Sequence, residues 1–296
     1  MLKNIIRALR LAFASASALP FIFGSFVERT GFNLPAFLMG LVAVVSAHLS
    51  ANLINDYADS RSGNDWQDKK FYGLFGGSKL IQEGVYPEGF YLNSAILFAA
   101  ISCGSVLLLA LILKSGLVIG LFFCIILLAW SYSAWPLRLS YRRLGEFVVF
   151  FLFGPVPVMA GYFIQTGVFP DLKSFQLSFP FGFLTTAILF SNEIPDFVED
   201  KRAGKLTWVS LFGRKHAYLA YGLLIALAFF TISINVFLGY LKSWGLFSFI
   251  LIIPGLKAAK ILRDFPTDKI KLIESSKLTI AVQALTGLIL ILTALL

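Results

Sequence analysis

The amino-acid sequence predicts an all-α membrane protein that crosses the bilayer many times. Of its 296 residues, 58% are hydrophobic and only 14% are charged, and the mean hydropathy is +0.81. Soluble domains carry about 25% charged residues, so this composition argues against a soluble fold. Apolar stretches of roughly 17–25 residues, the length that crosses the hydrocarbon core of a bilayer, recur along the whole chain.

We expect about nine transmembrane helices, joined alternately by short connections and by longer, charged loops. Because no linker or low-complexity tract divides the chain, residues 1–296 are expected to form a single integral membrane domain. The basic N-terminus resembles a signal peptide, but Pro20 interrupts its apolar stretch and many spans follow, which favours a retained first helix. The expected spans cover residues 11–29, 35–54, 91–113, 116–133, 144–165, 178–194, 216–237, 244–262 and 278–296.

The distribution of basic residues predicts the orientation of these helices. When the loops are assigned alternately to two sides, one side holds roughly 21 of the 25 Lys and Arg residues. Cytoplasmic loops retain positive charge, so we expect a bacterial cytoplasmic (inner) membrane protein whose N-terminus and long loops are cytoplasmic and whose C-terminus is outside. The net charge of +9 then reflects topology, and nucleic acid is not expected as a partner.

A first cluster of acidic residues follows the second expected span, on the predicted cytoplasmic side. The sequence NLINDYADSRSGND occupies residues 52–65. If the helix continues through it, Asn52, Asp56 and Asp59 lie at positions i, i+4 and i+7 on one face, and Asp65 follows in the loop. Ionisable groups at a helix end within a membrane bundle indicate a functional site.

A second cluster repeats this pattern at the end of the sixth expected span. The sequence NEIPDFVEDKRAGK occupies residues 192–205, and Asn192, Asp196 and Asp200 again follow one another at intervals of four. Both helices enter the cytoplasmic face in the same direction. We therefore expect the two clusters to lie at the same end of the bundle.

Carboxylate and amide oxygens at this density repel one another unless a hard divalent cation bridges them. Magnesium prefers a few carboxylates together with substrate phosphates, so the clusters indicate a phosphorylated substrate. Basic residues that would meet phosphate oxygens stand nearby: Lys79 after the Gly-rich stretch YGLFGGSK, Arg138 and Arg142 in the middle loop, and Lys201 after the second cluster. The same residues also fit a simpler interpretation as solvated loop charges and topology signals.

These motifs resemble those of the UbiA-type intramembrane prenyltransferases. NDYADSRSGND at 55–65 is similar to the first aspartate-rich motif of that superfamily, and DFVEDKRAGKLT at 196–207 is similar to the second. YSAWPLRLSYRRLGEFVVFFLFGPVPVMAGYFIQTG at 132–167 further resembles the branch that prenylates 1,4-dihydroxy-2-naphthoate, to which GGSKLIQEG at 76–84 is also similar. The third acid of the broader family's motif would fall at Gly63, and Asp65 takes its place with the spacing of this branch.

The resemblance implies a nine-helix bundle around a central cavity that opens toward the lipid and is capped by the motif-bearing cytoplasmic loops. It implies transfer of a polyprenyl group from polyprenyl diphosphate to 1,4-dihydroxy-2-naphthoate, with decarboxylation to demethylmenaquinol, in menaquinone biosynthesis. Two Mg²⁺ ions would bridge the diphosphate. The implied metal ligands are Asn52, Asp56, Asp59, Asp65, Asn192, Asp196 and Asp200. The implied catalytic residues are Asp56, Asp59, Asp196, Asp200 and Lys79. The residues that we expect to bind diphosphate or acceptor are Asn52, Asn55, Tyr72, Lys79, Tyr132, Arg138, Arg142, Asn192 and Lys201.

Other functions fit parts of the same pattern. The acceptor of a prenyltransferase could instead be 4-hydroxybenzoate, homogentisate or a glycerol phosphate lipid. A divalent-cation transporter would use the aspartates to line a path, and a scaffold without catalysis would carry them as loop charges. Prenyl chain length and oligomeric state are not determined by the sequence.

The two histidines are candidate proton acceptors because an imidazole titrates near neutral pH. His48 lies one helical turn from Asn52 on the same face, so we interpret it as a packed, hydrogen-bonded residue. We interpret His216 as a residue of the membrane interface.

Overall fold

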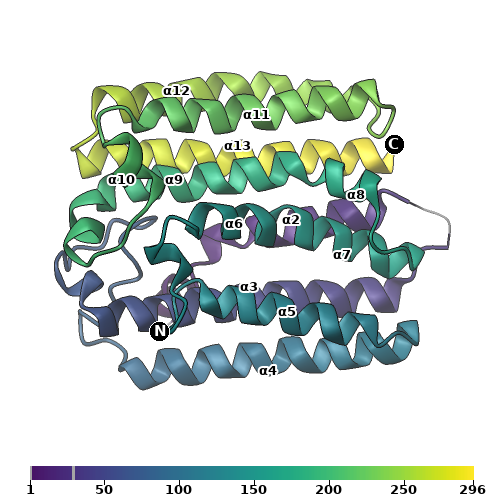
Figure 1. Ribbon diagram of the computed structural model, residues 1–296, viewed down its shortest axis with the longest axis horizontal. Helices are drawn as coiled ribbons and strands as arrows, with labels where there is room; N and C mark the ends of the chain where they lie inside the picture. Colours follow the sequence, from purple (N-terminus) through teal and green to yellow (C-terminus); the bar gives the residue numbers. More distant parts are fainter. Residues whose placement is uncertain (1, 29–30) are drawn as a thin grey trace.

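The computed structural model describes residues 2–28 and 31–296, and in this part of the chain the architecture is all-helical. The long helices run side by side along the longest axis and form a bundle (Figure 1). The two termini lie at opposite ends of it (Figure 1). The fold class predicted from the sequence is confirmed.

The helices of the first half are α1 (Leu2–Ala8), α2 (Ser15–Phe26), α3 (Leu34–Ser62), α4 (Glu88–Leu113), α5 (Leu117–Ser131), α6 (Gly145–Phe153) and α7 (Pro155–Thr166). Those of the second half are α8 (Leu172–Leu177), α9 (Phe179–Arg202), α10 (Trp208–Phe212), α11 (Ala217–Phe237), α12 (Ile252–Asp264) and α13 (Lys269–Leu295). Segments of 3₁₀ helix cover Leu11–Phe13, Asn64–Trp66, Leu139–Tyr141 and Ser243–Leu251.

Seven helical segments of the described chain are long and apolar enough to cross a membrane. They are Leu34–Ser62, Glu88–Leu113, Gly145–Thr166, Leu172–Arg202, Ala217–Phe237, Ser243–Asp264 and Lys269–Leu295. An eighth span results if α1 and the following segment Leu11–Phe26, which are bent by 52° to each other, cross together, and α5 is apolar but shorter. Within the described residues, each of the nine expected ranges coincides with apolar helical segments, and residue 29 of the first range lies outside them. The count of nine spans is not confirmed.

Helix α3 carries the first acidic motif beyond the apolar layer. It begins at Asn33, whose Oδ1 accepts a hydrogen bond from the Ala36 N–H at 3.0 Å, and it ends at Gly63 with φ of 83°. Its 29 residues span about 43 Å at 1.5 Å per residue, whereas a hydrocarbon core is about 30 Å thick. The last turns, which hold Asp56 and Asp59, therefore reach the membrane interface at the motif end of the bundle.

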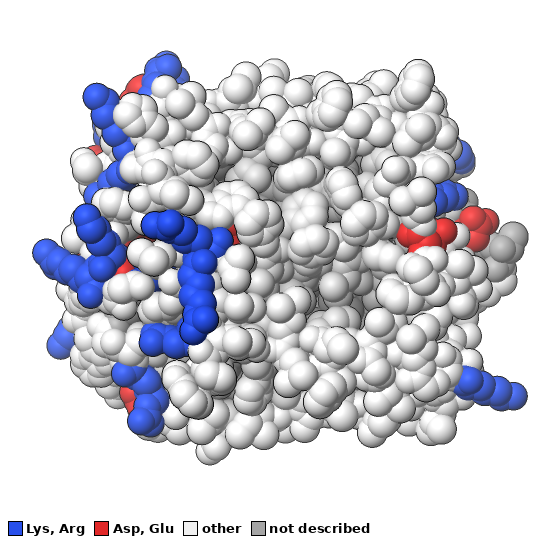
Figure 2. All heavy atoms as spheres, in the orientation of Figure 1, with Lys and Arg blue, Asp and Glu red and all other residues white. Residues whose placement is uncertain are grey.

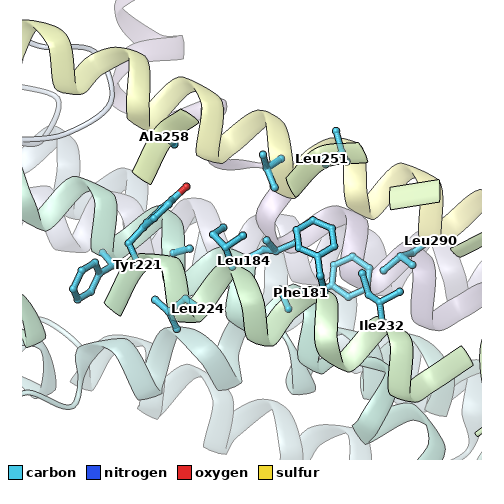
Figure 3. Packing of buried hydrophobic residues seen from close by; sticks show 14 of the residues in the cluster. Phe181, Leu184, Tyr221, Leu224, Ile232, Leu251, Ala258 and Leu290 are labelled. Carbon is cyan, nitrogen blue, oxygen red and sulfur yellow. The ribbon is translucent and has the colours of Figure 1, made fainter. Parts of the chain in front are cut away.

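Helix α9 holds the second motif and is fixed by packing on several sides. Phe181 and Leu184 of α9 pack with residues of α11 and α13, including Tyr221 and Leu290 (Figure 3). The Tyr221 hydroxyl shares a hydrogen bond of 2.8 Å with Thr279 Oγ1 of α13. The C-terminal ends of α9 and α3 lie at the same end of the bundle, as expected from their common direction (Figure 1).

Charged residues lie at the ends of the bundle and not around its middle. Lys and Arg side chains gather at the end that holds the motif loops, and uncharged residues cover the middle of the visible face (Figure 2). An uncharged belt of this kind is suited to contact with lipid, because a charged side chain is costly at the bilayer centre.

Candidate active site

A cavity of about 690 Å³ lies inside the bundle. Its charged lining residues come from the motif end, that is, from the ends of α3, α9 and α13 and from the neighbouring loops. Farther from this end the lining is apolar and includes Ala43 of α3 and Phe163 and Ile164 of α7. The cavity therefore has a polar mouth and an apolar interior.

Helix α3 continues through Asn52, Asp56 and Asp59, as predicted, and the first motif contributes Asn52, Asn55 and Asp59 to the cavity lining. Asp59 is 7% exposed and accepts hydrogen bonds from Asn55 Nδ2 at 3.3 Å and from the Tyr141 hydroxyl at 3.2 Å. Asn55 Oδ1 in turn accepts a hydrogen bond from the Ser133 hydroxyl. The side chains of the first motif are thus held by the segment that follows α5.

Asp56 does not line the cavity directly. It is 2% exposed, and its Oδ2 accepts a hydrogen bond from the Ser78 N–H at 3.1 Å. Its Oδ1 lies 3.6 Å from the Arg10 guanidinium and has no hydrogen-bond partner among the described residues. A buried carboxylate oxygen without a hydrogen bond is costly, and here the nearby Arg10 guanidinium compensates its charge.

The second motif places Asn192, Asp196 and Asp200 in the cavity lining. Asn192 Oδ1 accepts a hydrogen bond from the Ser276 hydroxyl of α13 at 2.8 Å. Lys205 Nζ lies 3.6 Å from Asp200 Oδ1. Although burial opposes its charge, the carboxylates of Asp200 and of the first motif hold the pKa of Lys205 well above its usual range.

The glycine-rich loop at residues 76–79 connects the two motifs. The Gly76 N–H donates to Asp196 Oδ2 at 2.8 Å, and the Ser78 N–H donates to Asp56 Oδ2 at 3.1 Å. One short backbone segment therefore contacts a carboxylate of each motif. The similarity of GGSK to a segment of the naphthoate branch corresponds here to a physical link across the mouth of the cavity.

Lys79 ends this loop and pairs with Asp65. Lys79 Nζ lies 2.9 Å from Asp65 Oδ1 and also donates to the Asp65 carbonyl oxygen at 3.0 Å. Burial, and after it the Asp59 carboxylate, raise the pKa of Asp65 to about 7, while Lys79 opposes this shift. The carboxylates of the first motif are thus crowded enough that an additional cation would stabilise their ionised form.

Breaking this ion pair is expected to destabilise the protein. Lys79→Met leaves Asp65 buried without its partner, so we expect the free energy of unfolding to fall by about 3 kcal/mol. Lys257→Met, which breaks the exposed pair with Glu274, is the control and should change it by less than about 0.5 kcal/mol. Unfolding in detergent measures both, and the double variant Lys79→Met/Asp65→Asn should recover part of the loss. Equal effects of the two single variants would contradict this prediction.

Two predicted tyrosines line the cavity, and a lysine that the sequence did not single out joins them. Tyr72 and Tyr132 are both lining residues, and the Tyr72 hydroxyl donates to Asp68 at 3.1 Å. Lys269, the first residue of α13, donates to Asp68 at 2.8 Å and to Glu199 at 3.0 Å. Lys269 therefore links the loop after the first motif to α9. It is far from both motifs in the sequence, so no local pattern predicted this contact.

The predicted basic residues divide into two groups. Lys79 lines the cavity, whereas Arg138, Arg142 and Lys201 are not among its lining residues. Arg142 and Lys201 are exposed. Lys205 and Lys269 line the mouth instead. Lys205 belongs to the sequence of the second motif, only four residues beyond Lys201. Its closeness to Asp200 in the sequence could have indicated that it lies at the site.

The oxygen-rich mouth fits Mg²⁺ only if a substrate completes the coordination. Within residues 2–28 and 31–296, no three His, Cys, Asp or Glu side chains converge closely enough to hold a metal ion by themselves. The donors present are hard carboxylate and amide oxygens, and Asp56 Oδ1 accepts no hydrogen bond from the described residues. Magnesium commonly takes one or two carboxylates and completes its shell with water and substrate phosphates, so this donor set fits it.

Two aspartate-rich helix ends at the mouth of an apolar cavity in a membrane bundle define an intramembrane prenyltransferase. The chain belongs to the UbiA prenyltransferase family, whose model matches residues 17–271. This membership confirms the resemblance that the two motifs indicated.

Relatives and solved structures agree with this assignment. A UbiA prenyltransferase domain-containing protein 1 homolog of Drosophila melanogaster is 30% identical over 76% of this chain, which spans 62% of that protein's length. The 1,4-dihydroxy-2-naphthoate octaprenyltransferase of Bacillus subtilis (strain 168) is 27% identical over 90% of this chain and 84% of its own.

Among solved structures, the apo UbiA homolog of Aeropyrum pernix K1 has a TM-score of 0.75 at 18% identity, covering 94% of this chain and 97% of its own. A UbiA homolog of Archaeoglobus fulgidus bound to GPP and Mg²⁺ has a TM-score of 0.60 at 14% identity, covering 97% and 99%. These likenesses support the fold.

Proposed function

We propose that residues 1–296 form one membrane domain that transfers a polyprenyl group from polyprenyl diphosphate to 1,4-dihydroxy-2-naphthoate, with decarboxylation to demethylmenaquinol, in menaquinone biosynthesis. The observation that carries the transferase part is the loop at 76–79, which joins the two aspartate motifs at the mouth of an apolar cavity. The acceptor is supported by the name of the Bacillus relative, which aligns with 90% of this chain.

Magnesium would be held at both motifs. Asn52, Asp56, Asp59 and Asp65 would hold one ion, and Asn192, Asp196 and Asp200 a second, with the diphosphate between them. When bound, the metal would neutralise the diphosphate and make it a better leaving group. The Archaeoglobus homolog is described as bound to GPP and Mg²⁺, which supports this ligand pair.

Basic side chains at the mouth would bind the diphosphate oxygens that the metal does not coordinate. We assign this role to Lys79, Lys205 and Lys269, because they line the cavity. The basic residues Arg138, Arg142 and Lys201, which were also candidates from the sequence, lie outside that lining. Preorganised cations near the leaving group stabilise the charge that develops as the allylic C–O bond breaks.

The apolar interior would hold the prenyl chain and exclude water from the reacting carbon. Gly40, Ala43 and Ala47 of α3 line the cavity and leave room along this helix, while the rings of Phe13 and Phe153 border it. Aromatic faces stabilise a nearby cation, and a dry site prevents its capture by water.

The orientation follows from the charge distribution. The end of the bundle where Lys and Arg gather is the end that carries the motifs, and we place it in the cytoplasm of a bacterial cell (Figure 2). The N-terminus would then be cytoplasmic and the C-terminus outside. A divalent-cation transporter would require charged groups along its path, whereas the deeper cavity lining around Phe163 and Ile164 is apolar.

Purified protein in detergent, incubated with radiolabelled polyprenyl diphosphate, Mg²⁺ and 1,4-dihydroxy-2-naphthoate, is expected to form a prenylated product. EDTA should abolish product formation, because the diphosphate would lose its neutralising cation. Parallel reactions with 4-hydroxybenzoate, homogentisate and a glycerol phosphate lipid test the acceptor. Product with one of these alone would overturn the naphthoate assignment, and no product with any acceptor would overturn the transferase.

A further inference from the structure

His48 is held on two sides within the cavity wall. It lies on α3, is 7% exposed and lines the cavity. Its Nδ1 lies 2.8 Å from the Ser17 Oγ of α2, and its ring meets Phe153 of α6 edge to face with centroids 5.0 Å apart. The ring orientation is therefore fixed by neighbours from two other helices.

The contacts of Ser17 accommodate a His48 tautomer whose Nε2 is free to accept a proton. Ser17 Oγ lies 3.2 Å from the Ala14 carbonyl oxygen, which can accept its single proton. With the proton placed there, Nδ1 of His48 donates to Ser17 Oγ and Nε2 carries a lone pair; we assign this tautomer. Among the described residues, Nε2 has no hydrogen-bond partner.

A histidine that served packing alone would have both ring nitrogens satisfied, because buried polar groups are nearly always paired. Here Nε2 is without a hydrogen-bond partner among the described residues, in a cavity wall that also includes Ala47 and Ala51. His48 lies one helical turn before Asn52 on α3, on the side farther from the mouth of the cavity. Residues at this spacing have Cβ atoms about 5–6 Å apart. This position is where the reacting carbon would lie below a diphosphate held at the mouth.

We propose that His48 is a catalytic base that takes the proton of a ring hydroxyl of the aromatic acceptor, and that Ser17 is its positioning residue. This inference rests on the proposed function and revises our interpretation of His48 as a merely packed residue. It names a side chain that touches the acceptor, whereas the aspartate motifs serve the diphosphate.

The proton and electron changes balance within the proposed reaction. The hydroxyl proton passes to Nε2, and the neighbouring ring carbon, which bears the carboxyl group, bonds to the allylic carbon as the C–O bond to diphosphate breaks. The diphosphate leaves with that electron pair. Loss of the ionised carboxyl group as CO₂ returns an electron pair to the ring, and the ring oxygen recovers its proton from Nε2.

The test compares His48→Gln with His216→Gln, which changes the chain's other histidine at an exposed position before α11. We expect His48→Gln to lower turnover on the order of 10²-fold while the Kd for prenyl diphosphate stays within about twofold. His216→Gln should leave both unchanged. Ser17→Ala should lower turnover by less than His48→Gln, since the base remains but its orientation is lost.

A second variant separates proton transfer from packing. His48→Ala should regain turnover when imidazole is added, whereas a packing defect would not respond to a soluble base. The proposal that His48 is the catalytic base would be overturned by either of two results: turnover of His48→Gln within about threefold of wild type, or no rescue of His48→Ala by imidazole. Failure of the wild-type protein to prenylate any acceptor would instead overturn the proposed function, and the two failures are therefore distinguishable.

Discussion

Asp196→Asn is expected to lower the rate of prenyl transfer by about 10³-fold, or about 4 kcal/mol of transition-state stabilisation. Asn keeps the size of the side chain and an oxygen that accepts the Gly76 N–H, so the link to the loop at 76–79 is preserved. What is lost is the negative charge that would hold the metal against the leaving diphosphate. Initial rates with saturating prenyl diphosphate and Mg²⁺ measure the effect.

Glu274→Gln is the matched control for this experiment. Glu274 lies on α13, its side chain is 56% exposed, and it pairs with Lys257 at 2.7 Å. Its substitution also removes one negative charge from the protein, but the charge is outside the cavity lining, so the rate should stay within about twofold of wild type. Equal losses in the two variants would mean that net charge matters and that Asp196 has no specific role.

Gly77→Ala is expected to lower activity by about 10²-fold through a steric effect on the mouth of the cavity. A Cβ at Gly77 would lie 2.6 Å from Asp65 Oδ2, so either Asp65 or the loop must move. The loop cannot shift freely because its neighbours Gly76 and Ser78 contact both motifs. A displacement of about 1 Å in a catalytic site is sufficient for a loss of this size.

Gly73→Ala is the control that separates the steric clash with Asp65 from the cost of a left-handed backbone conformation. Gly73 and Gly77 both have positive φ, 94° and 75°, but a Cβ at Gly73 meets nothing within 4 Å. Both variants should lose about 1 kcal/mol of stability for a left-handed non-glycine residue. Only Gly77→Ala should lose activity beyond that, and similar activities of the two variants would refute a role for the contact with Asp65.

The sequence predicted the fold and most of the polar mouth for identifiable reasons. Helix length and apolarity are local properties, so the expected spans coincide with helices, although the bent N-terminal segment and the short α5 leave the number of spans open. The spacing of Asn52, Asp56 and Asp59 predicted a helical motif, and α3 does continue through all three.

Spacing along a helix did not predict which motif residues face the cavity. Asp56 shares its helix with Asn52 and Asp59, but it lies beneath the loop at 76–79 against Ser78 and Arg10. A loop that folds over a helix can cover one residue of a motif and leave the next exposed to the cavity. The helical period does not predict where such a loop will lie. Mutating Asp56 therefore tests both a proposed ligand and a structural contact, which is why Asp196 is the better probe.

By itself the sequence determined the helical membrane fold, the two acidic motifs and their common end of the bundle, because apolarity, charge and helical period are encoded locally. Only the tertiary structure decided which cations meet those acids, bringing Lys269 to Asp68 and Glu199 across 201 and 70 residues. It also decided the partners of His48, since Ser17 and Phe153 come from other helices. Contacts between distant segments depend on how helices pack, and that packing is set by the whole bundle.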